Sequence, residues 1–256
     1  MELFDLTGKV AVITGSTKGI GLAIAEEMAR HGARIVVTSR KADACDAVAA
    51  KIRDAGGEAV ALPCNVSNKD QLEALVAGAR DALGRIDVLV CNAAVNPHFG
   101  PSLEIPDDAF QKVLDVNICS NHWLIRMVAP EMIERRDGAI IVVSSIGGLR
   151  GSATLGAYGI SKAADMQIVR NMAMELGPHN IRVNGIAPGL VKTDFARALW
   201  EDPVRSAARV EKTPLRRIGE PRDIAGIAVY LASDAGAWTT GQTIVVDGGV
   251  TSVGEG

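Results

Sequence analysis

Short apolar runs recur along the chain and alternate with longer segments whose apolar residues have helical spacing. The runs are continuously apolar, which is typical of strands that are covered on both faces of a parallel sheet. Seven such runs are expected to be strands, at 9–14, 34–39, 58–64, 86–92, 139–145, 181–187 and 242–248. The helical segments between them include 20–31, 42–55, 68–83 and 108–135. This alternation predicts an α/β fold, in which a doubly wound parallel sheet of about seven strands carries helices on both faces.

No linker, low-complexity tract or charge block divides the sequence, so residues 1–256 are expected to form a single domain. The most irregular stretch is 189–222, which is rich in charged residues and carries a few large apolar ones. A connection of this length between a strand and a helix is usually functional. We therefore expect an insert around 190–217 to act as a lid over a substrate.

Composition narrows the classes of function. The formal net charge is −3, which argues against a nucleic-acid or anionic-membrane partner, because both favour basic surfaces. The four cysteines lack metal-ligand spacing, so we expect no metal site and reduced thiols in a reducing compartment. The N-terminus does not resemble a signal peptide, and no apolar run approaches the ~20 residues that span a bilayer. The sequence thus predicts a soluble, cytoplasmic protein.

A glycine-rich turn follows the first apolar run, in the stretch TGSTKGIG. Glycines at a strand-to-helix junction allow a tight turn and let the backbone approach a pyrophosphate, while the helix N-terminus offers free N–H groups to the phosphates. A purely structural turn is the alternative, but the position after the first strand of a βαβ unit favours nucleotide binding. The expected cofactor-binding residues here are Gly15, Ser16, Lys18, Gly19, Ile20 and Gly21.

The second run ends in VVTSRK, which bears on the choice of nucleotide. An NAD site usually has a carboxylate at this point to hold the ribose 2′-hydroxyl. Here Ser39 and Arg40 occupy the position, and Arg40 could pair with a 2′-phosphate, with Lys18 in reach of the same group. Solvated surface charges are the alternative for both cations. Two cations without a competing carboxylate favour NADP(H), with NAD(H) as the second choice.

Four polar residues are candidates for the chemistry. Ser145 ends the fifth run, Tyr158 follows it, and Lys162 lies four residues after Tyr158 in YGISK. Residues at i and i+4 share a helix face, and a nearby cation favours the ionised form of a tyrosine, which is otherwise a weak acid and base near neutral pH. Asn117 lies within the 108–135 segment. Each residue alone has an ordinary structural explanation, but their combination behind a nucleotide turn indicates proton transfer to a carbonyl oxygen.

With these motifs in order, the sequence resembles the short-chain dehydrogenase/reductases over nearly its whole length. The matching stretches are TGSTKGIG, CNAAV at 91–95, SS at 144–145, YGISK at 158–162, IRVNGIAPG at 181–189 and VDGG at 246–249. The resemblance implies a Rossmann-like domain and a catalytic tetrad of Asn117, Ser145, Tyr158 and Lys162. Tyr158 would be the general acid/base, and Lys162 would assist it and hold the nicotinamide ribose. Ser145 would orient the carbonyl, and Asn117 would position a water in a proton relay.

The same resemblance implies further contacts with the cofactor. They involve Asn65, Val66, Asn92, Ala93, Ala94, Pro188, Gly189, Val191 and Thr193. Cys91 and Ala94 depart from the family motif NNAG, and Asn65 replaces an aspartate that meets the adenine in many members. An asparagine carbonyl could still accept that bond, so we expect little loss. CNAAVNPHFGP, APGLVKTDFARALW and RRIGEP are more narrowly similar to the NADP-dependent carbonyl/retinal reductase branch, which is dehydrogenase/reductase member 4-like.

The expected mouth of the site is apolar and suits a ketone, an aldehyde or a secondary alcohol. Its candidate lining residues are His98, Phe99, Leu149, Leu155, Phe195, Leu199 and Trp200. Arg150 and Arg197 could meet an acidic group, although surface ion pairs are the simpler explanation for them. The helices at 108–135 and 158–176 are apolar on more than one stripe, and the resemblance implies a homotetramer built on them.

Two other functions stay open from the sequence. One is a 3-oxoacyl-thioester reductase, for which Lys212, Arg216 and Arg217 could offer a basic surface to an acyl carrier protein. The other is a sensor that binds NADP(H) without turnover, although such a protein has no use for a tyrosine paired with a lysine. The sequence leaves open the natural substrate, the direction and the stereochemistry of the reaction.

Overall fold

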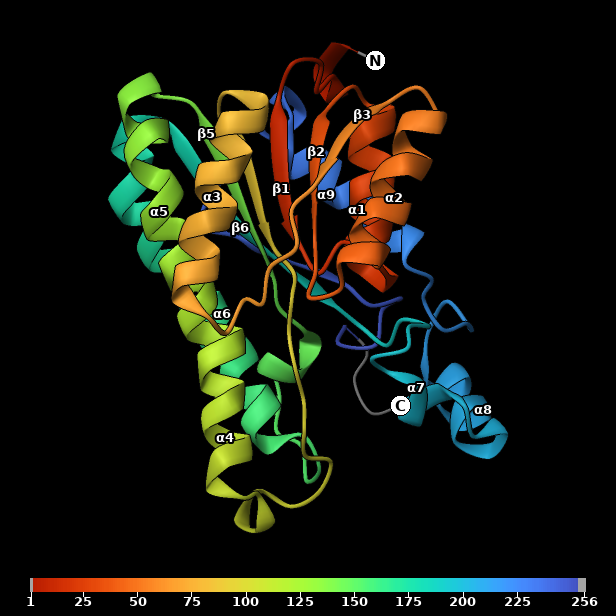
Figure 1. Ribbon diagram of the computed structural model, residues 1–256. Coiled ribbons are helices and arrows are strands. Elements are labelled where there is room, and N and C mark those ends of the chain that lie inside the picture. Colours follow the sequence, from red (N-terminus) through yellow and green to blue (C-terminus); the bar gives the residue numbers. More distant parts are fainter. Residues whose placement is uncertain (1, 253–256) are drawn as a thin grey trace.

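The computed structural model describes residues 2–252 and contains one seven-stranded sheet with the order β3-β2-β1-β4-β5-β6-β7 (Figure 1). Every pair of neighbouring strands in it is parallel. The strands are β1 (Val10–Thr14), β2 (Arg34–Thr38), β3 (Glu58–Ala61), β4 (Val88–Cys91), β5 (Gly138–Val143), β6 (Ile181–Pro188) and β7 (Thr243–Val246). The order reverses between β1 and β4, as in a doubly wound sheet. The predicted fold class is therefore confirmed.

Helices cover both faces of the sheet. One face carries α1 (Gly19–Arg30), α2 (Ala42–Asp54) and α9 (Arg222–Ala232), and the other carries α3 (Lys69–Leu83), α5 (Ser120–Arg135) and α6 (Gly156–Leu176) (Figure 1). Each face has its own apolar cluster between helices and strands. Strands β1, β4 and β5 are buried at every position, which explains why their sequences are continuously apolar.

The carboxyl edge of the sheet is where the chain extends beyond the two helical layers. There α4 (Asp107–Leu114) continues below α5, and the small helices α7 (Arg197–Trp200) and α8 (Pro203–Lys212) project on the other side (Figure 1). The segment that carries α7 and α8 begins and ends at one point, because Val191 and Gly219 form a parallel bridge. The segment between these two residues therefore leaves and rejoins the rest of the fold at the same place.

The expected helix at 108–135 is confirmed, because the chain is helical without a gap from 107 to 135. A π-helical turn, Asp115–Cys119, lies between α4 and α5, and the sequence did not predict this turn. The turn coincides with Asn117, whose side chain bonds the backbone of Val95 in a neighbouring loop. π-Helical turns are rare in proteins, and many of those that occur lie at functional sites. Among the described residues, no helix combines the length and apolar character needed to cross a membrane.

Candidate active site

Tyr158 and Lys162 lie on adjacent turns of α6, as their spacing predicted. The Lys162 ammonium is 5.7 Å from the centroid of the Tyr158 ring. Lys162 is only 2% exposed, whereas Tyr158 is partly accessible at the carboxyl edge of the sheet. The structure therefore places a buried ammonium next to a partly accessible phenol, on one face of α6.

Ser145 lies just past the end of β5, where it caps the short 3-10 helix Ile146–Gly148. Its hydroxyl accepts a hydrogen bond from the backbone N–H of Gly147 at 3.0 Å. A methyl group on Gly147 would lie 3.4 Å from the Ser145 hydroxyl and 3.8 Å from the Tyr158 ring. The Ser145 and Tyr158 side chains therefore converge on the same small space.

Asn117 is fully buried, and its side chain is held from several directions. Its amide oxygen accepts from the Val95 N–H at 2.8 Å, and its amide nitrogen donates to the Val95 carbonyl at 3.0 Å and to the Ser161 hydroxyl at 3.0 Å. Ser161 in turn donates to the backbone carbonyl of Tyr158 at 2.7 Å. The structure thus brings Asn117 to the site through the first turns of α6.

Two polar residues near Lys162 were not among the sequence candidates. Asp165 pairs with the Lys162 ammonium at 2.8 Å, and Asn121 donates to Asp165 at 2.9 Å. The sequence carried one signal for them, because Asp165 falls on the apolar stripe of α6, where Met166 and Val169 are buried. An ionisable residue on such a stripe needs a buried partner.

The glycine turn has a backbone that leaves little room for side chains. Gly15 and Gly19 have φ values of 67° and 59°, which side chains rarely adopt. A Cβ at Gly21 would lie 2.5 Å from the Gly15 carbonyl oxygen and from the Asn92 amide nitrogen. Residues without side chains are thus required where α1 begins and its first N–H groups face the carboxyl edge.

The surroundings of the turn are fixed by buried polar groups. Ser16 is fully buried and bonds the backbone of Thr38 at the end of β2, while Asn92 donates to the Thr14 carbonyl at 2.8 Å. The hydroxyl of Thr38 is buried and lacks a partner among the described atoms. Ala93 donates its N–H to the Thr14 hydroxyl at 3.0 Å. The loop after β4 is therefore tied to the end of β1, next to the glycine turn.

The three candidates for the nucleotide 2′-position have different surroundings. Arg40 is exposed and forms no ion pair with any residue between 2 and 252. Ser39 lies next to Cys45, with 3.3 Å between hydroxyl and thiol. Lys18 lies 3.9 Å from Asp194, so it is partly engaged by the loop after β6. Arg40 is therefore the cation with the most freedom to meet an added anion.

The loop after β6 reaches back over the glycine turn. A Cβ at Gly19 would lie 3.1 Å from the Thr193 side chain, and Trp200 donates to the Thr193 carbonyl at 3.0 Å. Phe195 packs its ring 5.8 Å from that of Tyr158. The same loop therefore lies over both the predicted phosphate site and the predicted catalytic tyrosine.

The start of this loop is fixed on the sheet. Pro188 and Val191 are buried, and Gly189 donates its backbone N–H to the Val246 carbonyl at the end of β7, at 2.9 Å. The segment that reaches the glycine turn and Tyr158 therefore begins from a firm base.

The remaining predicted residues have no contact partner that defines a role for them. Asn65 folds back on its own loop and accepts from the Ser67 hydroxyl at 3.0 Å, with Val66 half-buried beside it. Ala94 and Ile20 are also half-buried, at the loop after β4 and at the start of α1. His98 bonds the Pro101 carbonyl at 3.2 Å, which makes it part of the structure of its loop.

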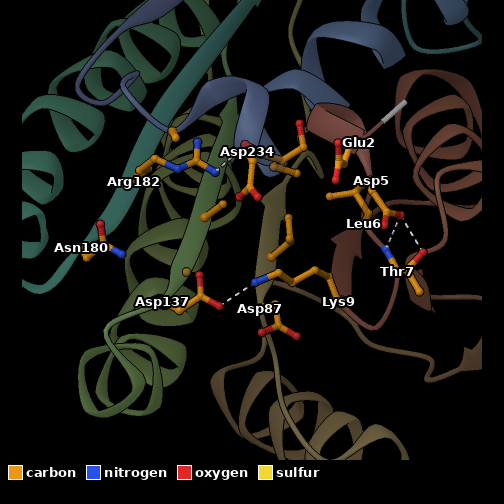
Figure 2. A pocket seen from close by; sticks show the side chains of 16 residues that line it. Glu2, Asp5, Leu6, Thr7, Lys9, Asp87, Asp137, Asn180, Arg182 and Asp234 are labelled. Atoms are coloured by element: carbon orange, nitrogen blue, oxygen red, sulfur yellow. Dashed lines mark hydrogen bonds and ion pairs between the residues drawn. The ribbon is translucent and has the colours of Figure 1, made fainter.

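A separate hollow of about 380 Å³ lies at the opposite, amino-terminal edge of the sheet (Figure 2). Its charged side chains serve the fold. Lys9 pairs with Asp137 at 2.6 Å, and Arg182 donates to the carbonyls of Leu231 and Gly236. Asp87 accepts from the Val10 N–H at 2.9 Å and pairs with Arg85. These groups join strand ends to neighbouring elements, and the candidate catalytic residues lie at the other edge.

A parallel sheet with a glycine turn after β1 and polar residues at its carboxyl edge is typical of the dinucleotide-binding Rossmann domains. A family model described as enoyl-(acyl carrier protein) reductase matches residues 15–251. Dehydrogenase/reductase SDR family member 4 from Bos taurus is 42% identical over 96% of this chain and 88% of its own. The human protein of that name is also 42% identical, over 96% of this chain and 89% of its own.

Solved structures that are similar to this chain are also dehydrogenases. A gluconate 5-dehydrogenase from Burkholderia cenocepacia in complex with NADP and tartrate has a TM-score of 0.95 at 33% identity, covering 99% of each chain. A 7α-hydroxysteroid dehydrogenase complexed with NADH and 7-oxo glycochenodeoxycholic acid has a TM-score of 0.93 at 39% identity, covering 97% of this chain and 96% of its own. The chain belongs to the short-chain dehydrogenase/reductase family. It is therefore an oxidoreductase of a family that uses a nicotinamide cofactor.

Proposed function

We propose that the protein is an NADP(H)-dependent oxidoreductase that interconverts a ketone or aldehyde with the corresponding alcohol, with Tyr158 as general acid/base. The observation that carries the proposal is the buried Lys162 ammonium, 5.7 Å from the centroid of the Tyr158 ring. The 42% identity of the chain to dehydrogenase/reductase SDR family member 4 supports this class of reaction.

The residues at the carboxyl edge fit a nicotinamide dinucleotide. The glycine turn would hold the pyrophosphate, since side chains at Gly15, Gly19 and Gly21 would fill the space or strain the backbone. Arg40 would meet the 2′-phosphate of NADP(H), because it is exposed and lacks an ion pair with any described residue. Asn92, Val191 and Thr193 would contact the rest of the cofactor, since Asn92 and Thr193 lie against the glycine turn. The bound nicotinamide supplies or accepts the hydride.

The chain itself supplies the proton. Tyr158 would donate its phenolic proton to the developing alkoxide in reduction and take it back in oxidation. The Lys162 ammonium would interact favourably with the negative charge that forms on the Tyr158 oxygen when the proton leaves. Ser145, which converges with Tyr158 beside Gly147, would donate a hydrogen bond to the substrate oxygen and fix its position. Asn117 would anchor the relay end of this arrangement through Ser161 and Val95.

The mouth of the site supports an uncharged, partly apolar substrate. Phe99, Leu149 and Phe195 are about half exposed at the carboxyl edge, and Phe195 packs near Tyr158. Arg197 pairs with Asp194 at 2.6 Å, so its guanidinium is less available to bind an acidic group of a substrate. The 190–217 insert would close over this mouth as a lid.

The acyl-carrier reductase alternative has less support in the structure. Arg217 pairs with Asp223, and Arg216 donates to the Glu211 carbonyl, so two of the three candidate cations for an acyl carrier protein are engaged.

A homotetramer remains part of the proposal, supported by Ile160 and Met174, which are 53% and 80% exposed on α6. A monomer in light scattering at micromolar concentration would contradict the tetramer. The compartment stays a prediction from the sequence.

The test is NADPH oxidation across a panel of ketones, aldehydes and acetoacetyl thioesters. The proposal expects turnover with ketones or aldehydes, and thioester-selective turnover would favour the acyl-carrier alternative. Tyr158→Phe should abolish turnover and retain cofactor binding in a fluorescence titration. The matched control is Tyr230→Phe, which removes a hydroxyl that bonds Thr239 on the far side of the fold. Full activity in Tyr158→Phe, or no turnover with any carbonyl substrate, would overturn the proposal.

A further inference from the structure

A buried carboxylate lies directly behind the candidate catalytic lysine. Asp165, three residues after Lys162 on α6, accepts from the Lys162 ammonium at 2.8 Å. The two side chains are 0% and 2% exposed, respectively. Taking two charges out of water is costly, and a buried ion pair is weak evidence for stability. A pair of this kind beside a reactive tyrosine therefore calls for a functional explanation.

The carboxylate is also fixed from a second helix. Asn121 on α5 donates to the other oxygen of Asp165 at 2.9 Å and to the Asn117 carbonyl at 2.7 Å. Asn121 is itself 2% exposed, so the whole arrangement is shielded from water. Asp165 is thus held between α5 and α6, at the point where the π-helical turn passes into α5.

The contacts of the Lys162 ammonium determine where it points. Of its three N–H groups, one donates to Asp165 and another to the Val143 carbonyl at 2.9 Å. One N–H is left for the side on which Tyr158 lies. Asp165 and β5 therefore orient the ammonium as well as burying it.

The charges around Lys162 come from three groups within the described chain. Asp165 and Tyr158 lie on the same helix, and Cys91 faces it from the end of β4. Burial raises the pKa of the Cys91 thiol far above its ordinary range, so this group stays neutral. The contacts from α5 and β5 are a neutral amide and a carbonyl. Asp165 is therefore the counter-charge that faces the ammonium at neutral pH.

The protonation of the pair follows from this environment. Burial acts to lower the pKa of Lys162, but the Asp165 carboxylate outweighs it, with help from Tyr158, and the pKa is raised. Burial also raises the pKa of Asp165, against the effect of Lys162 and Asn121. Both groups are charged at pH values above the raised pKa of Asp165 and below the raised pKa of Lys162.

We propose that Asp165, held by Asn121, is a positioning residue that keeps the Lys162 ammonium charged and aimed at Tyr158. The inference rests on the proposed function, since that function gives Lys162 its role in turnover. A buried lysine without a counter-charge gives up its proton several pH units early. Asp165 would prevent this loss in the alkaline range.

The first test is the pH profile of kcat for alcohol oxidation with NADP⁺ in Asp165→Asn, which removes the charge and keeps the shape. We expect the alkaline limb of the profile to move down by at least about one pH unit. Asn121→Ala should move it in the same direction by a smaller amount, and it supplies the test if Asp165→Asn does not fold. The matched control is Asp87→Asn, a 2% exposed carboxylate at the opposite edge of the sheet, which should leave the profile in place.

The second test needs neither substrate nor cofactor. It compares the thermal unfolding of the wild-type protein and Asp165→Asn from neutral pH to about pH 10, near the ordinary pKa of a lysine. In the variant the unfolded state binds more protons at Lys162 than the folded state does, so stability rises with pH. The wild-type lysine stays protonated in both states over most of this range. The stability deficit of the variant should therefore narrow as the pH rises.

Two results would overturn the inference. One is a uniform loss of rate in Asp165→Asn with an unmoved profile, together with a stability deficit that does not depend on pH. The other is a higher kcat in Asp165→Asn with the acid limb of its pH profile moved to lower pH. That result would mean that Asp165 weakens the electrostatic effect of Lys162 on Tyr158. If the wild-type protein reduces no carbonyl substrate, the proposed function fails, and the unfolding comparison still decides whether Asp165 keeps Lys162 charged.

Discussion

Phe195 packs its ring against that of Tyr158, with 5.8 Å between the centroids and 44° between the planes. Phe195 is 52% exposed, so much of its ring is open to a bound substrate. The contact connects the insert after β6 with the candidate catalytic tyrosine, and we therefore expect the insert to influence which carbonyl compound reaches that tyrosine.

Phe195→Ala should weaken the use of bulky apolar ketones. Burying an aromatic side chain against a substrate contributes about 1.5–3 kcal/mol, so we expect kcat/KM for such ketones to fall by roughly 10-fold or more. The smallest ketones and the Kd for NADPH should change little. Phe4→Ala, which removes a 41% exposed ring in the N-terminal 3-10 helix Glu2–Phe4, serves as the control. An equal loss for small and bulky ketones would contradict a selective contact.

Arg40→Ala should raise the KM for NADPH and leave that for NADH nearly unchanged. A charge-assisted hydrogen bond contributes about 1.5–3 kcal/mol, which corresponds to a change of roughly 10- to 100-fold. Adding Ser39→Asp should move the preference toward NADH. Lys51→Ala removes an exposed cation at the other end of α2 and should leave the NADPH/NADH ratio unaltered. Unchanged cofactor kinetics in the double variant would refute the assignment of Arg40.

Gly21→Ala should reduce both cofactor affinity and stability. The added Cβ would lie 2.5 Å from the Gly15 carbonyl oxygen, so the backbone of the glycine turn must move. We expect the Kd for NADPH to rise at least about 10-fold, measured by fluorescence titration. Gly78→Ala on α3 is the control, since its Cβ meets Leu62 at an ordinary 3.4 Å and alanine favours a helix. Wild-type affinity in Gly21→Ala would remove the turn from the proposed site.

The thiol of Cys64 should make stability fall at alkaline pH. Burial raises its pKa from 9.0 to about 11. The unfolded thiol therefore ionises at lower pH than the folded one, and the stability that this group contributes below pH 9 is lost as the pH rises toward 11. Cys64→Ala should show a shallower decline than the wild-type protein between those values, measured by denaturant unfolding. Parallel declines in the two proteins would show that other groups dominate.

Local spacing was enough to predict much of the site. The interval of four residues predicted that Tyr158 and Lys162 share a face of a helix, and the continuous apolar runs predicted the buried parallel strands. The sequence could not predict the π-helical turn at Asp115–Cys119, because the turn accompanies a bond from Asn117 to a loop remote in sequence. It also could not place Asn121 against Asp165, since that contact depends on how α5 packs on α6.

The bridge between Val191 and Gly219 has a consequence for how such a protein can diversify. Both ends of the segment that carries α7 and α8 meet at this bridge. Residues can therefore be inserted, deleted or exchanged within the segment while the strands of the sheet stay in register. Selection can then alter substrate choice within this segment while the sheet and α6 keep Tyr158 and Lys162 in place. One framework could serve many metabolites through the replacement of a single loop.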